Sequence, residues 1–224
     1  MSKIVGISIL TNSNRSPFLV RCVRRLIEGS CYRPLVVGIL DNGSTDNTPE
    51  VCQDFPHADD YGLSWRVERS ELDRGCAWGT NRSIELVKDC DLQLHLESDF
   101  ILTDGFDKMW LNRAVKFFET HQPNYLYLRK FLSDAEMAHH WFHQWREQLT
   151  DTHGPFQHCE NFWWSNNPAL FDYRKLKQSG TLPLNEVLDG PKNSDNWSRP
   201  ELSTARPRRA WMWGFGEGPF VHEG

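Results

Sequence analysis

The sequence of 224 residues contains no long apolar segment, no internal repeat and no tract with the composition of a linker. No run approaches the roughly 18 apolar residues that a membrane-spanning helix needs. The short apolar stretch near the N-terminus also lacks the small-residue site at which a signal peptide is cleaved. We therefore expect one domain over residues 1–224 and a cytoplasmic protein.

An excess of positive charge and a cysteine framework are also missing. The net charge is −5, which argues against a generally electropositive nucleic-acid binder, although a local basic groove stays compatible with it. The six cysteines form no CxxC pair, and a chain of this length buries a sufficient core without disulfides. We expect free, mostly buried thiols in a reducing compartment.

Tryptophan, in contrast, is abundant, with ten residues, seven of them after position 140. Tryptophan rings stack on flat apolar ligand faces, and they also fill cores. Composition alone leaves both roles open.

Continuous apolar strands alternate with amphipathic helices through the first part of the chain. Strands are predicted at residues 4–10, 34–40, 65–69, 92–96 and 125–128, and helices at 17–27, 48–55, 77–88, 107–121 and 133–148, with Ser16 and Ser133 as helix caps. The periodicity weakens after about residue 150, and short final strands are predicted at 210–212 and 219–222. This order predicts an α/β fold with a parallel sheet covered on both faces, in which ligands bind at the carboxyl ends of the strands.

The most informative polar cluster is Glu97-Ser98-Asp99, which follows the predicted strand at 92–96. Two carboxylates one residue apart at a strand end can face a Mg²⁺ or Mn²⁺ ion that also binds phosphate. On spacing alone, two solvated carboxylates are the commoner outcome. The apolar segment 100–102 that follows favours a partnered pair, because carboxylates are rarely buried alone.

Three further clusters lie at the same predicted edge. Asp41, at the end of the second strand, could accept from a base N–H or a ribose hydroxyl, although Asn42-Gly43 also suits an ordinary tight turn. The loop 11–15 offers hydroxyl, amide and guanidinium groups for ribose and phosphate, or is an ordinary loop. Arg74 could meet a diphosphate, and Gly75 permits close approach of the backbone.

In this order the clusters resemble the motifs of the inverting nucleotide-sugar glycosyltransferases of the large family-2 type. The matching segments are Thr11-Asn12-Ser13-Asn14-Arg15 for a T-x-N-R-like loop, Leu40-Asp41-Asn42-Gly43-Ser44-Thr45-Asp46 for V-D-N-x-S-x-D, Asp73-Arg74-Gly75 with Gly79-Thr80-Asn81 for N-x-G and A-x-N, and Glu97-Ser98-Asp99 for D-x-D. The resemblance covers residues 4–103 well and the rest loosely. The sequence departs from the family pattern at Glu97, where the first Asp is usual, and at Asp73, where Asn is usual.

The resemblance implies the GT-A fold, a Rossmann-like single domain with a mixed, mostly parallel central sheet flanked by helices. Residues 1–103 would form the nucleotide-sugar and metal half, and residues 104–224 the acceptor half. The implied reaction transfers a sugar, with inversion, from a nucleoside-diphosphate sugar to a hydroxyl of a glycan or glycoconjugate. A UDP-sugar is the expected donor, and Mn²⁺ or Mg²⁺ the expected cofactor.

The resemblance also assigns site residues. The nucleotide-sugar donor would be bound by Thr11, Asn12, Asn14, Arg15, Asp41, Asn42, Arg74, Asn81, Glu97 and Ser98. The metal would be bound by Asp99, by Glu97, which would lie nearer the donor ribose or sugar, and by the late His222. A histidine on a surface strand is the plain alternative for His222.

Inversion needs a base that takes a proton from the acceptor hydroxyl. The candidates are the carboxylates Glu186, Asp189, Asp195 and Glu201, of which Asp195 is chosen because Asn193-Ser194-Asp195 resembles the acidic motif before the last helix. Asp189 and Glu186 are the alternates. By position, Trp163, Trp164 and Asn166 would bind the acceptor, although one of the two tryptophans is expected in the core.

Two other functions stay open on the sequence. A nucleotidyltransferase can share the α/β architecture, but it would need a glycine-rich phosphate loop after the first strand, and the loop 11–15 contains no glycine. A non-catalytic carbohydrate-binding domain could use the tryptophans, but it would need neither Asp41 nor the acidic triplet.

Overall fold

The computed structural model describes residues 2–55, 63–130, 149–159, 168–178, 210–213 and 218–223. The strands within them are β1 (Val5–Thr11), β2 (Leu35–Asn42), β3 (Ser64–Ser70), β4 (Leu92–Glu97), β5 (Phe100–Leu102), β6 (Tyr125–Tyr127), β7 (Leu149–His153), β8 (Phe156–Cys159), β9 (Ala169–Phe171), β10 (Ala210–Trp213) and β11 (Phe220–His222). The helices are α1 (Ser16–Glu28), α2 (Thr48–Asp54), α3 (Cys76–Glu85), α4 (Trp110–His121) and α6 (Tyr173–Gln178).

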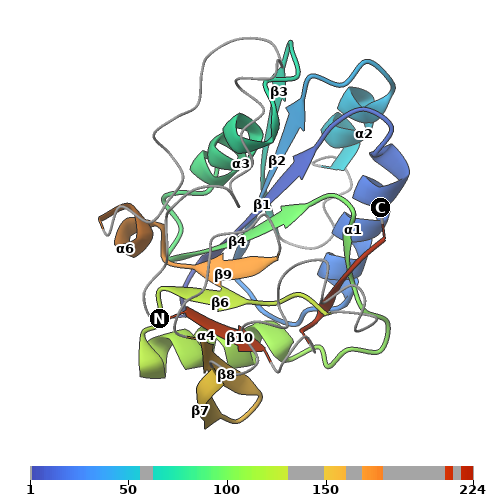
Figure 1. Ribbon diagram of the computed structural model, residues 1–224. Helices are drawn as coiled ribbons and strands as arrows, with labels where there is room; N and C mark the ends of the chain where they lie inside the picture. Colours follow the sequence, from blue (N-terminus) through green and yellow to red (C-terminus); the bar gives the residue numbers. More distant parts are fainter. Residues whose placement is uncertain are drawn as a thin grey trace.

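A mixed sheet of nine described strands forms the centre of the molecule, in the order β3-β2-β1-β4-β9-β6-β10-β8-β7 (Figure 1). Strands β3, β2, β1 and β4 all run parallel to one another, and β10 runs parallel to β6. Strand β9 runs antiparallel to β4 and β6, and strand β8 runs antiparallel to β10 and β7. The predicted α/β fold with a mixed, mostly parallel sheet is therefore confirmed.

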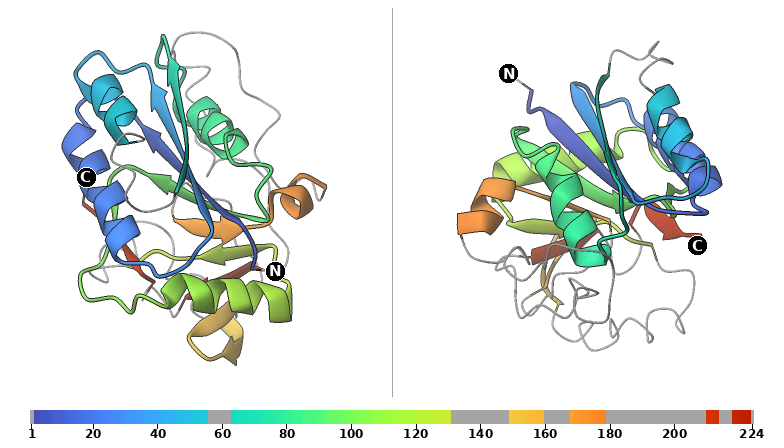
Figure 2. Two further views of the ribbon diagram at one scale, coloured as in Figure 1. Left: turned by 180° about the vertical axis from the view of Figure 1, so that it is seen from behind. Right: turned by 90° about the horizontal axis from the view of Figure 1, so that it is seen from above.

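Helices cover both faces of the parallel part, with α1 and α2 on one face and α3 on the other (Figure 2). The first face is apolar and shares one core with α1, formed by Val5, Ile7, Ile9, Leu19, Val23 and Leu26 among others. Burying each such side chain stabilises the fold by about 1.5–3 kcal/mol. The second face needs a close approach at Gly6, because an added Cβ would lie 2.5 Å from the Cβ of Val87.

A second, two-stranded sheet pairs β5 with β11 in antiparallel register, with His222 opposite Phe100. Backbone hydrogen bonds extend this pairing on both sides, from Thr103 N to Pro219 O and from Glu223 N to Asp99 O. The predicted late strand at 219–222 is thus confirmed. It lies directly beside the segment that follows the acidic triplet.

Some predictions about secondary structure need correction. Helix α1 begins at Ser16 itself, and Arg15 occupies the cap position without a side-chain cap hydrogen bond. The Ser16 hydroxyl instead donates to Asn47 Oδ1 over 3.2 Å, so it is not free to cap its own helix. Strands β5, β7, β8 and β9 and helix α6 are not among the elements that the sequence predicts. The predicted helix 133–148 lies outside the described residues.

The structure also places five of the six cysteines and the two tryptophans of β10. Cys22, Cys31, Cys52, Cys76 and Cys90 form no disulfide bond within the described residues, and three of them are buried. Trp211 and Trp213 are buried in the core at 8% and 7% exposure, so they pack rather than bind an acceptor. Across the part of the chain described here, no helix has the length and apolar composition needed to cross a membrane.

Candidate active site

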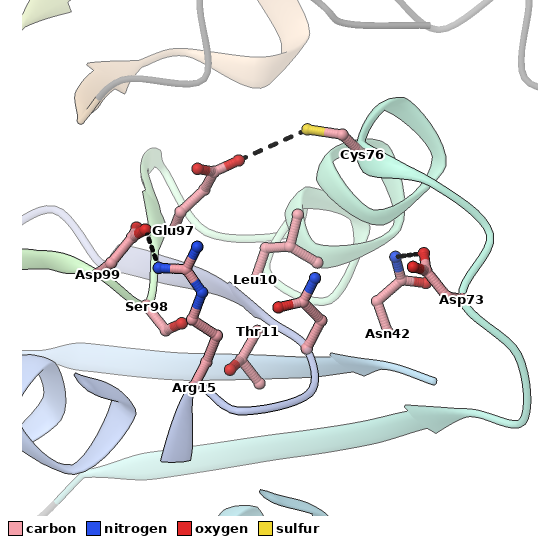
Figure 3. Close-up of a pocket in the computed structure, with 10 residues that line it drawn as sticks. Leu10, Thr11, Arg15, Asn42, Asp73, Cys76, Glu97, Ser98 and Asp99 are labelled. Atoms are coloured by element: carbon pink, nitrogen blue, oxygen red, sulfur yellow. Dashed lines mark hydrogen bonds and ion pairs between the residues drawn. The ribbon is translucent and has the colours of Figure 1, made fainter. Parts of the chain in front are cut away.

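A pocket opens where β1, β2 and β4 end, at the carboxyl edge of the parallel strands. Its lining residues are Leu10, Thr11, Asn12, Arg15, Asn42, Asp73, Cys76, Glu97, Ser98 and Asp99 (Figure 3). Most of them come from the motifs that the sequence singled out. The structure therefore brings the β1–α1 loop, the end of β2, the start of α3 and the acidic triplet to one cavity, as the parallel topology predicts.

Asn42 uses its amide group inside the protein. Its Nδ2 donates to Asp73 Oδ1 over 3.1 Å and to Gly75 O over 3.2 Å, and its Oδ1 accepts from the Arg74 backbone N–H over 3.2 Å. These contacts fix the loop before α3 against the end of β2. Asn42 thus shapes one wall of the pocket, with its amide already hydrogen-bonded to that loop.

The turn after Asn42 depends on glycine. Gly43 has a φ of +74°, and an added Cβ would lie 2.1 Å from the backbone nitrogen of Asp73. Both the left-handed backbone and the close approach exclude a side chain at this position. Asp73, which stands where the family usually has Asn, accepts from Asn42 and from the Gly75 N–H over 2.9 Å. Its carboxylate therefore holds the same loop in place.

Asp41 precedes Asn42 at the end of β2 and is 1% exposed. It accepts hydrogen bonds from the backbone N–H and the hydroxyl of Ser44, and its Oδ2 lies 3.7 Å from Arg69 Nε. Burial raises the pKa of Asp41, and the Ser44 hydrogen bonds and Arg69 only partly oppose this. In the structure Asp41 stabilises the turn at 41–44, and its contact with a nucleotide base stays a prediction.

Three other predicted donor-binding residues lie beside the pocket rather than in its lining. The Asn14 N–H donates to Asp46 Oδ2 over 2.6 Å, which joins the first loop to the second. The Arg74 guanidinium lies 5.0 Å from the centre of the Trp78 ring. Asn81 is buried on α3.

Asp99 and His222 lie side by side, although they are far apart in the chain. The distance between Asp99 Oδ2 and His222 Nε2 is 3.3 Å, and the pairing of β5 with β11 sets it. Arg21 adds an ion pair to Glu223 over 2.6 Å, next to His222. Burial acts to raise the pKa of Asp99, but the hydrogen bond with His222 and the charge of Arg15 outweigh it, so this pKa is held below its usual value.

Asp99 and His222 fit a divalent cation. A carboxylate oxygen and an imidazole nitrogen are both metal ligands, and phosphate oxygens commonly complete a Mg²⁺ or Mn²⁺ site. Within the described residues, Asp99 Oδ1 is buried and makes no hydrogen bond, so its lone pairs are available to a ligand. Such an unsatisfied carboxylate oxygen is costly unless something binds there.

Glu97 lies apart from this pair. Its Oε1 accepts from the Cys76 thiol over 3.5 Å, whereas Asp99 contacts Arg15, and Figure 3 shows the two carboxylates with these different partners. Among the residues that the structure describes, no three His, Cys, Asp or Glu side chains gather as a metal site. The role of Glu97 as a metal ligand stays a prediction, and its contact with Cys76 places it on the α3 side of the pocket.

Cys76 and Leu10 line the pocket although sequence reasoning did not select them. Cys76 is the first residue of α3 and follows Gly75, so the motif around Gly75 was the available signal. The base candidates Glu186, Asp189, Asp195 and Glu201 lie outside the described residues, as do the acceptor candidates Trp163, Trp164 and Asn166.

Comparison with known proteins decides the family. The sequence pattern of the family described as "Glycosyl transferase family 2" matches residues 9–179. The chain belongs to glycosyl transferase family 2. This is an inverting family, and its pattern spans both the pocket motifs and the described strands up to β9.

One curated relative and several solved structures are similar to this chain. Glycosyltransferase GlyG of Streptococcus pneumoniae serotype 4 is 30% identical over 88 residues, which are 39% of this chain and 28% of GlyG. The mannosyltransferase PcManGT from Pyrobaculum calidifontis, solved in complex with GDP-Man and Mn²⁺, aligns with a TM-score of 0.59 and 17% identity over 84% of this chain and 49% of its own. TarS 1–349 of S. aureus, solved in complex with UDP-GlcNAc, aligns with a TM-score of 0.61 and 14% identity over 99% of this chain and 59% of its own.

At these identities the two structures show the shared fold alone, and that fold is GT-A-like. The family-2 chain described here spans less than two thirds of the length of each of these proteins.

Proposed function

We propose that this family-2 chain is a metal-dependent glycosyltransferase. It would transfer a sugar from a nucleoside-diphosphate sugar, with a UDP-sugar as the first donor to test, to a hydroxyl of a glycan or glycoconjugate, with inversion. The observation that carries this proposal is the meeting of the family's motif residues around one pocket, with the Asp99–His222 pair at its edge.

Asp99 and His222 would hold Mn²⁺ or Mg²⁺, which supplies positive charge against the diphosphate as it leaves. Arg15, which lines the same pocket, adds a guanidinium suited to phosphate oxygens. Thr11 lies in the wall at 2% exposure, and its Oγ1 makes no hydrogen bond within the described residues. That hydroxyl is suited to the ribose or the base.

The acceptor side of the proposal rests on residues outside the described ranges. Asp195 would take the proton from the acceptor hydroxyl as its oxygen attacks the anomeric carbon and the bond to the diphosphate breaks. Trp163, Trp164 and Asn166 would bind the acceptor sugar. Asp195→Asn should abolish transfer and leave nucleotide binding intact, whereas loss of transfer in Asp189→Asn alone would move the role to Asp189.

The test is a screen of UDP-, GDP- and TDP-sugars, with and without Mn²⁺, that follows both thermal unfolding and hydrolysis of the donor. A ligand present at about 100 times its Kd stabilises the folded state by about 2.7 kcal/mol, which is easily detected as a rise in Tm. We expect one class of nucleotide to raise the Tm only with Mn²⁺. If no nucleotide raises the Tm in a metal-dependent way, the proposal is refuted.

A matched pair of variants links the effect to the pocket. Asp99→Asn removes the buried carboxylate charge beside His222, and should abolish the Mn²⁺-dependent rise in Tm. Asp104→Asn makes the same change at an exposed carboxylate that pairs with Arg25, and should leave the rise unchanged. Equal loss in both variants would contradict the assignment of the metal to Asp99.

A further inference from the structure

Arg15 already contacts the carboxylate that a metal would need. Its Nη1 donates to Asp99 Oδ2, the same oxygen that lies 3.3 Å from His222 Nε2. The Asp99 side chain is only 5% exposed, so this guanidinium is the cation that compensates its charge in the structure. Arg15 thus occupies the oxygen at which the proposed cation would bind.

The three groups differ in how firmly they are held. His222 lies in β11, whose backbone pairs with β5, and the Glu223 N–H donates to the Asp99 carbonyl over 3.0 Å. Arg15 lies outside this strand pairing, in the residue before α1, and its side chain is 35% exposed, close to the 34% of His222. Its guanidinium lines the pocket, 5.7 Å from the centre of the Phe18 ring. The strand pairing fixes the backbones that carry Asp99 and His222, whereas the long side chain of Arg15 can change rotamer without a change in either strand.

A divalent cation held by both Asp99 and His222 would bind Asp99 Oδ2, because this is the oxygen that lies 3.3 Å from His222 Nε2. The guanidinium already contacts Oδ2, and two positive groups so close together repel strongly away from bulk water. A metal at Oδ2 would therefore displace Arg15. The released guanidinium still faces the pocket, where the diphosphate of a donor offers it a bidentate partner.

We propose that Arg15 is an exchangeable internal cation that makes metal binding and donor binding depend on each other. In the donor-free protein it holds Asp99 and weakens metal binding. When the diphosphate arrives, Arg15 transfers to the phosphate oxygens and leaves Asp99 to the metal. Because such coupling is reciprocal, the metal strengthens donor binding by the same factor. This role rests on the proposed function, since it assumes a diphosphate donor.

The experiment measures Mn²⁺ affinity without turnover, from the electron paramagnetic resonance signal of free Mn²⁺, first without nucleotide. Arg15→Gln should bind Mn²⁺ about tenfold more tightly than the unmodified chain, within the usual range of coupling between sites. Arg25→Gln, which removes the same charge from a surface pair with Asp104, should bind Mn²⁺ with unchanged affinity. Arg15→Met should match Arg15→Gln, and provides the measurement if one variant fails to fold.

The second stage repeats the titration with UDP and with GDP. The nucleotide should tighten Mn²⁺ binding more in the unmodified chain than in Arg15→Gln, since only the former must release Asp99. Equal or weaker Mn²⁺ binding by Arg15→Gln and Arg15→Met without nucleotide would overturn the role of Arg15. Absence of Mn²⁺ binding in every variant, with and without nucleotide, would instead refute the metal site of the proposed function.

Discussion

Acid should destabilise this protein through one buried histidine in the strand that leads to the acidic triplet. His95 is 1% exposed in β4, with Nδ1 at 3.1 Å from Ser8 Oγ and 3.5 Å from Ser83 Oγ. Its Nε2 is buried and makes no hydrogen bond among the described residues. Burial lowers the pKa of His95 from 6.5 to about 3, because the charged ring would lose its water without gaining an acidic partner.

The direction and size of the effect follow from this difference. In the unfolded chain the pKa is near 6.5, so between about pH 6.5 and pH 3 the unfolded state binds a proton that the folded state does not bind. The free energy of unfolding therefore falls as the pH falls through this range. Above about pH 6.5 the contribution of His95 to stability is fully present. At pH 5 the loss due to His95 amounts to about 2 kcal/mol.

Urea unfolding of the unmodified chain and of His95→Gln, at about pH 7.5 and at about pH 5, isolates this contribution. Glutamine does not titrate, so the difference in unfolding free energy between the two proteins should change by about 2 kcal/mol between the two pH values, in favour of the variant at acid pH. His153→Gln, at an exposed histidine, is the control and should behave like the unmodified chain. A difference that stays constant with pH would refute the reasoning.

Three further predictions concern the pocket wall. A bound nucleotide should slow alkylation of Cys76, which lines the pocket, and leave the reactivity of the exposed Cys31 unchanged. Peptide mass spectrometry measures both rates, and equal slowing at the two thiols would contradict this prediction. Gly43→Ala should lower the free energy of unfolding by about 2–4 kcal/mol, because the backbone at this position is left-handed and an added Cβ would overlap the loop at Asp73. A decrease below about 1 kcal/mol in chemical unfolding would count against that geometry. Asn42→Asp would bring a second carboxylate against Asp73 and disturb the loop before α3. The variant should therefore raise the KM for the donor far more than it lowers kcat. An unchanged KM would argue against a role for this loop in donor binding.

The parallel half of the fold could be predicted because each of its buried strands carries its own signal. The segments around Ile7 and Ile39 are largely apolar runs, and the segment around Leu94 alternates leucine with polar residues. All three end in polar clusters, and this pattern needs no information from the rest of the chain. Strands β7, β8 and β9 contain only three to five residues each, and β7 reads Leu-Thr-Asp-Thr-His. Pairing with neighbours, rather than their own pattern, makes them strands.

For the site, the sequence predicts where the residues lie but not which way their side chains point. Sequence position placed Thr11, Asn42 and Asp99 at one edge, because strand ends of a parallel sheet must meet there. It could not tell that Asn42 turns its amide toward the loop before α3, or that the thiol of Cys76 meets Glu97. Those outcomes depend on distances between elements that only packing fixes.

The place of β10 in the sheet has a consequence for the order of folding. β10 lies between β6 and β8, and through it the β7–β8 hairpin joins the rest of the described sheet. The hairpin can close locally, and its Phe156 ring packs against Phe117 of α4, but it can join the sheet only after a strand from much later in the chain has inserted beside β6. Contacts between residues so far apart form slowly, because a long loop must close first. The parallel half of the fold, built from neighbouring β–α units, is therefore expected to fold first, with the far edge of the sheet completed last.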